Sequence, residues 1–115
     1  MYWFSCQGLY ISTMNDLDRN KNSQIKIRAN IVVKGKVQGV YFRQNAQRIC
    51  NEYGVTGWVH NVEDGSVEAK LEGDKNSVEA AIRWFKVGPP NAHVDKIELS
   101  YDIYSGEFQD FKIGY

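Results

Sequence analysis

The stretch of chain that could bind an anion covers residues 35–43, which read GKVQGVYFR, with two glycines and no acidic residue. Such a loop can turn several backbone N–H groups toward one point, and a helix that follows adds the positive end of its dipole. A phosphate suits that combination. The glycine spacing differs from that of a Walker loop and of a dinucleotide fingerprint. A glycine loop before a helix is also common as a plain connection.

Two polar side chains near this loop could act on a bound phosphate. Arg43 falls in the first turn of a predicted helix, where a cation is unfavourable by up to about 1 kcal/mol unless an anion is bound there. The alternative is a solvated arginine. Asn61 ends a predicted strand just before a hairpin, where asparagine is also common for turn reasons alone. His60 is expected to point to the opposite face of the sheet, as a surface histidine.

Hydrophobic periodicity predicts the elements that position these residues. Strict alternation indicates strands, and apolar steps of three and four indicate helices. Gly54 is the expected cap of the first helix, Asp64-Gly65 the hairpin turn, and Asp74 the N-cap of the second helix. In chain order we predict a strand over 25–33, a helix over 42–53, strands over 56–62 and 67–72, a helix from Asp74 until Gly88-Pro89-Pro90, and strands over 94–101 and 111–115.

This order predicts an α+β fold, the ferredoxin-like βαββαβ sandwich, with a predominantly antiparallel sheet, two helices on one face and an extra short C-terminal strand. In that arrangement the first and second strands run parallel, about 10 Å apart, with the third between them. Their C-terminal ends share one edge of the sheet. The loop before Arg43 and the strand end at Asn61 meet there, and an arginine can bridge most of that gap.

Length and composition indicate one domain. The chain has 115 residues, of which 43% are hydrophobic, and we place the domain at residues 24–115 after a polar, disordered arm over residues 1–23. Met14 lies in this arm and is a hypothetical physiological start. Trp58 and Trp84 occupy positions that favour core packing.

Charge, cysteines and histidines exclude several classes of function. The 14 basic residues balance the 14 acidic ones, which argues against sequence-independent nucleic-acid binding. Cys6 and Cys50 lie far apart, and His60 and His93 have no metal-ligand spacing. Two free thiols are typical of a reducing compartment. We therefore expect a monomeric cytoplasmic protein with no cofactor, no metal, and no nucleic-acid or membrane partner.

Two separated motifs resemble the signatures of the acylphosphatase family. GKVQGVYFR at residues 35–43 is similar to the first signature, and GWVHN at 57–61 followed by DGSVE at 64–68 is similar to the second. The similarity extends over roughly residues 25–115. Two positions depart from the family pattern: Lys36 stands where arginine is usual, and Gly114 stands where many members carry an arginine before the final tyrosine.

The resemblance implies hydrolysis of acyl phosphates, which are carboxyl-phosphate anhydrides, to carboxylate and inorganic phosphate by in-line attack of water. It implies that Arg43 holds the phosphate and that Asn61 positions the water, as the two catalytic residues. The implied phosphate-binding residues are Gln38, Gly39, Val40, Tyr41, Phe42 and Arg43. The substrate would be a small-molecule acyl phosphate, with phosphate or another oxyanion held in the loop.

This reaction needs few catalytic groups. The leaving carboxylate has a parent acid with a pKa of about 4, so it departs without being protonated. What remains is to hold the phosphoryl group, to stabilise charge on its equatorial oxygens and to aim a water in line. A guanidinium and fixed backbone N–H groups supply those interactions, which is why the sequence needs no Ser/His/Asp set and no metal cluster.

Two other functions share the predicted fold. A non-catalytic module that binds phosphate ligands, or a regulatory domain, would use the same loop, but the presence of both Arg43 and Asn61 speaks against it. An RNA-recognition domain would stack bases on aromatic residues of the third strand. Here residues 66–72 read SVEAKLE, without an aromatic side chain and with acidic side chains that are expected to face solvent.

Overall fold

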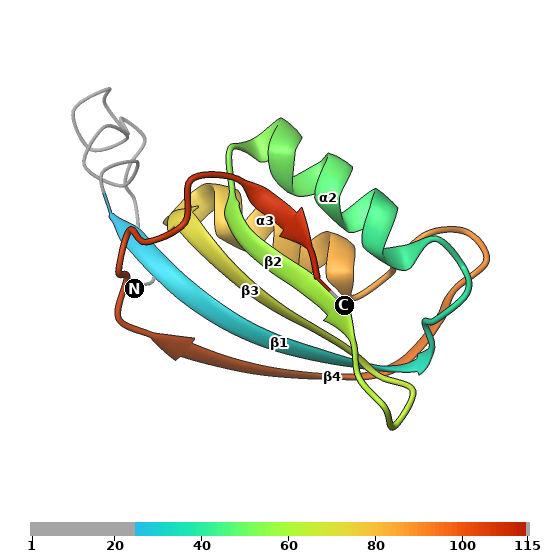
Figure 1. The fold of residues 1–115 in the computed structure, drawn as a ribbon. Coiled ribbons are helices and arrows are strands. Elements are labelled where there is room, and N and C mark those ends of the chain that lie inside the picture. The colour runs from blue at the N-terminus through green and yellow to red at the C-terminus, as the bar shows by residue number, and fades with distance from the viewer. Residues whose placement is uncertain (1–24, 115) are drawn as a thin grey trace, which may run out of the picture.

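The structure, a computed structural model, describes residues 25–114 (Figure 1). The predicted arm over 1–23, with Cys6 and Met14, lies outside the described residues. Tyr115, the final residue of the strand predicted over 111–115, also lies outside the described residues. The described part consists of β1 (Lys26–Lys36), α2 (Phe42–Tyr53), β2 (Thr56–Asn61), β3 (Val67–Asp74), α3 (Lys75–Phe85), β4 (His93–Asp102) and β5 (Phe111–Ile113).

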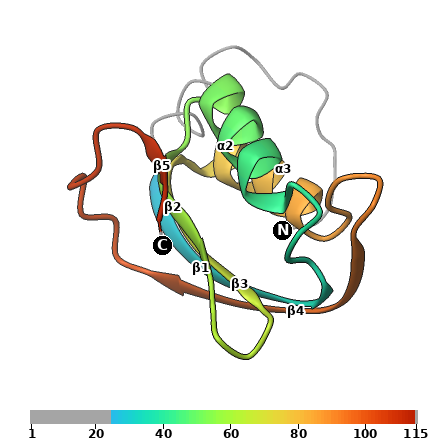
Figure 2. The same cartoon turned by 45° about the vertical axis from the view of Figure 1, so that its right-hand side comes forward.

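The five strands form one sheet in the order β4-β1-β3-β2-β5. β3 pairs antiparallel with β1 and with β2, so β1 and β2 run parallel on either side of it. β4 pairs antiparallel with β1, and the short β5 adds to β2 in parallel. Both helices cover the same face (Figures 1 and 2). The predicted ferredoxin-like sandwich with an extra C-terminal strand is confirmed.

The core lies between the helices and the inner face of the sheet. Alternate residues of β1, among them Ala29, Ile31 and Val33, are completely buried, as the period of two predicts. α2 contributes a stripe at helical spacing that includes Cys50, a free thiol whose pKa burial raises to about 12. Such a thiol stays protonated and acts as a small apolar side chain. Neither helix of residues 25–114 is long and apolar enough to cross a membrane.

The helix ends differ in how closely they follow the sequence signals. Gly54 caps α2 in the left-handed conformation, as predicted. Asp74 occupies the N-cap position of α3, but its side chain makes no capping hydrogen bond. It instead accepts a hydrogen bond from Lys26 at 2.6 Å. Trp84 packs against the core as predicted.

Trp58 is a correction to the predicted core. Gly57 and Val59 face the helices, so Trp58 points to the open face of the sheet and is only half-buried. There its ring stacks on His60, with centroids 4.5 Å apart, and Lys70 lies 5.8 Å from the ring centroid. His60 is thus on the face opposite Asn61, as predicted. The aromatic side chain covers the outside of the sheet instead of filling the core.

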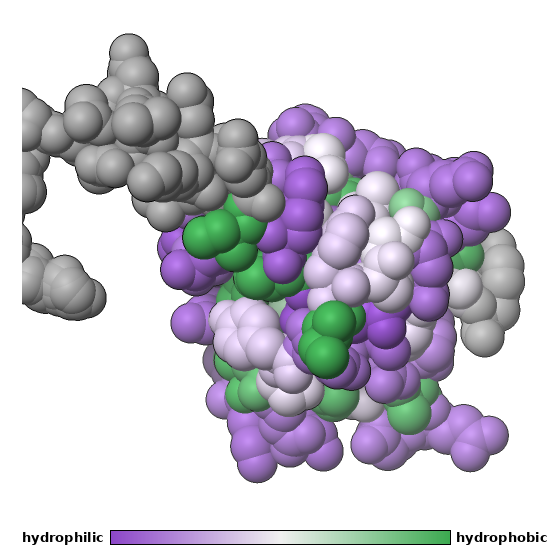
Figure 3. All heavy atoms as spheres, turned by 90° about the vertical axis from the view of Figure 1, so that its left-hand side faces the viewer, coloured by the Kyte–Doolittle hydropathy of each residue, from purple (hydrophilic) through white to green (hydrophobic). Residues whose placement is uncertain are grey.

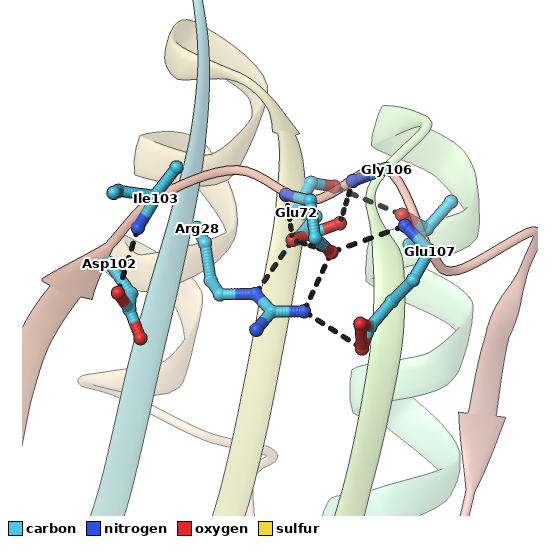
Figure 4. Close-up of polar contacts among 8 residues, drawn as sticks. Arg28, Glu72, Asp102, Ile103, Gly106 and Glu107 are labelled. Atoms are coloured by element: carbon cyan, nitrogen blue, oxygen red, sulfur yellow. Dashed lines mark hydrogen bonds and ion pairs between the residues drawn. The ribbon is translucent and has the colours of Figure 1, made fainter.

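Glu72 is a second correction, because this acidic residue of β3 does not face solvent. The connection between β4 and β5 passes over it, and its side chain is fully buried (Figure 4). Its carboxylate accepts hydrogen bonds from Arg28 Nε at 2.6 Å, Ser105 N and Oγ at 2.9 Å, and Gly106 N at 3.1 Å. We call Arg28, Glu72, Ser105 and Gly106 the Glu72 cluster.

The surface at that end of the molecule is mixed. In Figure 3 hydrophobic side chains interrupt a mostly hydrophilic face. β4 is an edge strand, and Leu99 and Tyr101, which alternate as the sequence predicted, are still exposed. The alternation therefore predicted the strand correctly. The helices cover the inner face of this strand only in part.

Candidate active site

The backbone of the loop between β1 and α2 forms a concave turn. Gly35 begins it against β4, so close that a Cβ atom would lie 2.2 Å from the carbonyl oxygen of His93. Gly39 and Tyr41 have positive φ angles of 75° and 63°, and the residues that flank them do not. Residues whose backbone conformations alternate between right-handed and left-handed turn their successive N–H groups to the same side of the chain. This is the geometry of an anion-binding nest.

The donors of this loop have no partner in the described protein. Within residues 25–114, no backbone or side-chain acceptor receives a hydrogen bond from the N–H groups of residues 38–42. The first turn of α2 holds no acidic residue that could take their place. Buried Val37 and Val40 anchor the loop to the core. A run of unpaired N–H groups on an anchored loop at a helix N-terminus is suited to an oxyanion.

Gln38 fixes this loop to the hairpin between β2 and β3. Its Nε2 donates to the carbonyl oxygens of Val62 at 2.7 Å and Ser66 at 2.9 Å. The hairpin is itself held by Asp64, whose Oδ1 accepts from the hydroxyl of Ser66 at 2.6 Å and from its N–H at 2.9 Å. These bonds lower the pKa of the Asp64 carboxyl. The Gln38 side chain therefore serves the scaffold, and only its backbone N–H is available to a phosphate.

Arg43 lies in the first turn of α2 and is partly buried. Its Nη1 donates to the carbonyl oxygen of Gly114 at 3.4 Å, which is long for a hydrogen bond. Gly114 in turn donates its N–H to Val59 on β2 at 2.8 Å. The arginine thus points toward the segment that follows β5, which is bonded to β2. Its remaining donors are unpaired within residues 25–114.

Asn61 is the last residue of β2, two positions beyond Val59 on the same face of the sheet. The hairpin that accepts hydrogen bonds from the Gln38 side chain begins directly after Asn61. Its Oδ1 is buried and has no hydrogen-bond partner among the described residues. A buried acceptor without a partner is costly, so this oxygen is suited to a water molecule or a ligand. The predicted site residues 38–43 and 61 therefore meet at one corner of the molecule.

The two departures from the family pattern have different surroundings. Lys36, which keeps the charge of the usual arginine, is exposed at the end of β1. A Cβ atom on Gly114 would meet His60 Cβ at 3.4 Å, which is tight van der Waals contact. The contacts of Gly114 to Arg43 and Val59 are made by its backbone alone, so a side chain is not needed for them.

Sequence reasoning missed the role of Gln38 as the link between the loop and the hairpin. The sequence signal is weak, because a glutamine beside a glycine reads as a solvated loop residue. Its two acceptors are 24 and 28 residues further along the chain. Among residues 25–114, no group of three or more His, Cys, Asp or Glu side chains is placed to hold a metal ion.

The family model and the curated relatives reported next are all acylphosphatases. The acylphosphatase family model matches residues 29–113. An acylphosphatase of Pyrobaculum islandicum is 53% identical over 88 residues, which cover 76% of this chain and 93% of the relative. An acylphosphatase of Pyrobaculum calidifontis is also 53% identical over 88 residues, covering 76% of this chain and 80% of the relative.

The fold agrees with that comparison. The crystal structure of an acylphosphatase from Bacillus subtilis superposes with a TM-score of 0.75 at 32% sequence identity, covering 77% of this chain and 99% of that one. The family model spans the loop over residues 35–43, which includes Arg43, as well as Asn61 and the short β5. The chain belongs to the acylphosphatase family.

Proposed function

We propose that Arg43, Asn61 and the backbone N–H groups of residues 38–42 carry the hydrolysis of acyl phosphates by this enzyme. The products are a carboxylate and inorganic phosphate. The observation that supports the proposal is a set of complementary unpaired groups at one corner of the fold. The N–H groups of the loop are donors without acceptors, and the buried Oδ1 of Asn61 is an acceptor without a donor, within the described residues.

The loop and Arg43 hold the phosphoryl group. Its equatorial oxygens accept from the N–H groups of residues 38–42, and the guanidinium of Arg43 makes charge-assisted bonds to the same group. The weak 3.4 Å contact of Arg43 with Gly114 is exchanged for phosphate at little cost. The positive end of α2 adds to the stabilisation, since no acidic side chain in its first turn opposes it.

Asn61 orients the attacking water. Its Oδ1 accepts one hydrogen bond from the water, so that the oxygen lone pair points at phosphorus. The carboxylate leaves on the opposite side without a proton, because the pKa of its parent acid is about 4. Positioning and electrostatic stabilisation supply the rate enhancement of such a phosphoryl transfer. The proposed mechanism involves no metal ion.

The experiment is the hydrolysis of benzoyl phosphate with and without EDTA, for the wild type and for Asn61→Ala. We expect metal-independent turnover that Asn61→Ala abolishes, while calorimetric titration with inorganic phosphate gives nearly unchanged binding. Asn30→Ala is the matched control, since Asn30 also has a buried Oδ1 without a partner among the described residues but lies on the open face. Weakened phosphate binding with normal turnover in Asn61→Ala would contradict the role in water positioning.

Three further parts of the proposal concern the surroundings of the enzyme. Phosphate or another oxyanion occupies the loop in the resting protein, the protein is a monomer, and it works in the cytoplasm. The free thiol of Cys50, which is typical of a reducing compartment, supports the last of these. Size-exclusion chromatography and cell fractionation test the monomer and the location.

A further inference from the structure

Tyr41 is an unusual residue for its position in the anion-binding loop. It has a φ angle of 63°, and no other non-glycine residue among residues 25–114 has a positive φ. Gly39, two positions earlier, has a similar φ of 75° and open space around it. Glycine adopts this conformation freely, whereas a bulky side chain is strained in it. The loop thus has glycine at one left-handed position and a tyrosine at the other.

The fold itself gains little from the Tyr41 side chain. The residue is 70% exposed, and its hydroxyl makes no hydrogen bond within the described residues. Its backbone carbonyl does serve the structure, because it accepts from the N–H of Asn45 at 3.2 Å and from Nδ2 of the same residue at 2.9 Å. A glycine could accept both bonds. The fold therefore does not explain the phenol ring. Strained residues of this kind cluster at functional sites, which indicates a functional role for the ring.

The other side chains of the loop are already occupied. Val37 and Val40 are buried, and Phe42 packs in the core against Trp84 and Phe85. The Gln38 amide is bonded to the hairpin, and Gly39 has no side chain. Tyr41 is therefore the one residue of positions 37–42 whose side chain is both exposed and not bonded to the described protein, so its ring is free to touch the part of a substrate beyond the phosphate.

We propose that Tyr41 is a specificity-determining residue, whose ring contacts the acyl group and favours aromatic acyl phosphates over acetyl phosphate. This inference rests on the proposed function, because it takes the phosphate to lie on the N–H groups of residues 38–42. The ring is attached to the same backbone that holds the phosphate, so a flat apolar acyl group beside it loses water and packs on an aromatic face. Acetyl offers too little surface for that contact.

The test compares kcat/KM for benzoyl phosphate with kcat/KM for acetyl phosphate. Tyr41→Asn removes the ring and keeps a residue that tolerates the left-handed conformation, and we expect the benzoyl-to-acetyl ratio to fall about tenfold. Tyr41→Phe keeps the ring and is expected to keep the ratio. Tyr53→Ala is the matched control, since it removes an exposed tyrosine at the far end of the same helix, about 18 Å away. Its ratio should equal that of the wild type.

A second measurement needs no variant. Inhibition of the wild type by phenylphosphonate and methylphosphonate presents the same phosphoryl head with and without an aromatic group, and we expect phenylphosphonate to bind about tenfold more tightly. An unchanged ratio in Tyr41→Asn, including equal losses on both substrates, or equal inhibition by the two phosphonates would overturn the role of Tyr41. Failure of the wild type to hydrolyse either substrate would instead refute the proposed function.

Discussion

Two clusters of polar side chains lie near opposite ends of β2, about 17 Å apart along the strand, and they differ in how completely they are bonded. In the Glu72 cluster the carboxylate accepts four hydrogen bonds, and Arg28 also pairs with Glu107 at 3.1 Å. At the candidate active site, Arg43 has one long bond and Asn61 Oδ1 has none within the described residues. The carboxylate of the first cluster is fully hydrogen-bonded, whereas the second cluster keeps unpaired groups that are suited to a ligand.

The difference teaches how to separate structural from catalytic polar groups. A buried charge is tolerated when all of its lone pairs are satisfied, and it then fastens the segments that supply its partners. Here Glu72 fastens the connection between β4 and β5 (Figure 4). Unsatisfied groups reduce stability, and under the proposed function the phosphate and the attacking water complete those beside Arg43 and Asn61. We therefore expect the two clusters to respond oppositely in assays of activity and stability.

The largest expected effect is on activity. Arg43→Ala should lower kcat/KM for benzoyl phosphate by about 10³-fold or more, by analogy with arginines that stabilise phosphoryl transfer, while the melting temperature changes little. Steady-state kinetics and thermal unfolding measure the two quantities. Arg48→Ala is the control, because Arg48 lies on the same helix and makes only solvent-exposed hydrogen bonds, to Glu52 and Asn45. Activity of Arg43→Ala within tenfold of the wild type would refute its catalytic role.

The next effect is on stability. Glu72→Gln keeps the shape of the side chain but leaves Arg28 without its buried partner, and we expect a loss of about 3 kcal/mol in the free energy of unfolding. Urea unfolding measures it. The folded fraction of this variant should keep kcat within about threefold of the wild type. Asp74→Asn, which removes the exposed pair with Lys26, should cost less than about 1 kcal/mol. Equal losses in the two variants would refute the structural weight given to the Glu72 cluster.

A smaller effect concerns the free energy of unfolding at acid pH. Burial by itself raises the pKa of Glu72, but the hydrogen bonds from Ser105 and Arg28 outweigh it, so the pKa lies below its ordinary value of 4.5. A lowered pKa means that stabilisation by the carboxylate is complete above pH 4.5 and is lost as the pH falls through the folded-state pKa. Unfolding free energies measured from pH 6 to pH 2.5 should therefore fall less steeply for Glu72→Gln than for the wild type. Parallel curves would show that Glu72 does not contribute to acid unfolding.

The smallest expected effect is at Gly114. Its N–H and carbonyl contact Val59 and Arg43, and the side chain of an arginine would extend along His60 on the open face. Gly114→Arg should therefore leave kcat/KM within about twofold of the wild type. A tenfold change in either direction, measured with benzoyl phosphate, would show that position 114 shapes the active site through more than its backbone.

Prediction from the sequence succeeded where the information is local. The alternation of β1, the helical stripe of α2 and the left-handed cap at Gly54 each depend on neighbours in the chain, and all three are confirmed. The predictions for Trp58 and Glu72 were wrong for different reasons. Trp58 lies between Gly57 and Val59, which face the helices, so the strand places it on the open face. Glu72 is also on the open face, and local patterns do not show that the distant connection between β4 and β5 covers it.

The sequence by itself determined the order of the elements, the glycine-containing loop before a helix and the family to which the chain belongs. These follow from side-chain period, backbone freedom and motif spacing, which act over a few residues. Only the tertiary structure decided that Gln38 is bonded to the hairpin, that Glu72 is fully satisfied, and that Asn61 Oδ1 and the N–H groups of the loop have no partners among the described residues. Hydrogen bonds between segments 24 to 44 residues apart depend on how strands and connections pack. That packing satisfies the groups of the Glu72 cluster and leaves unpaired groups at the proposed active site.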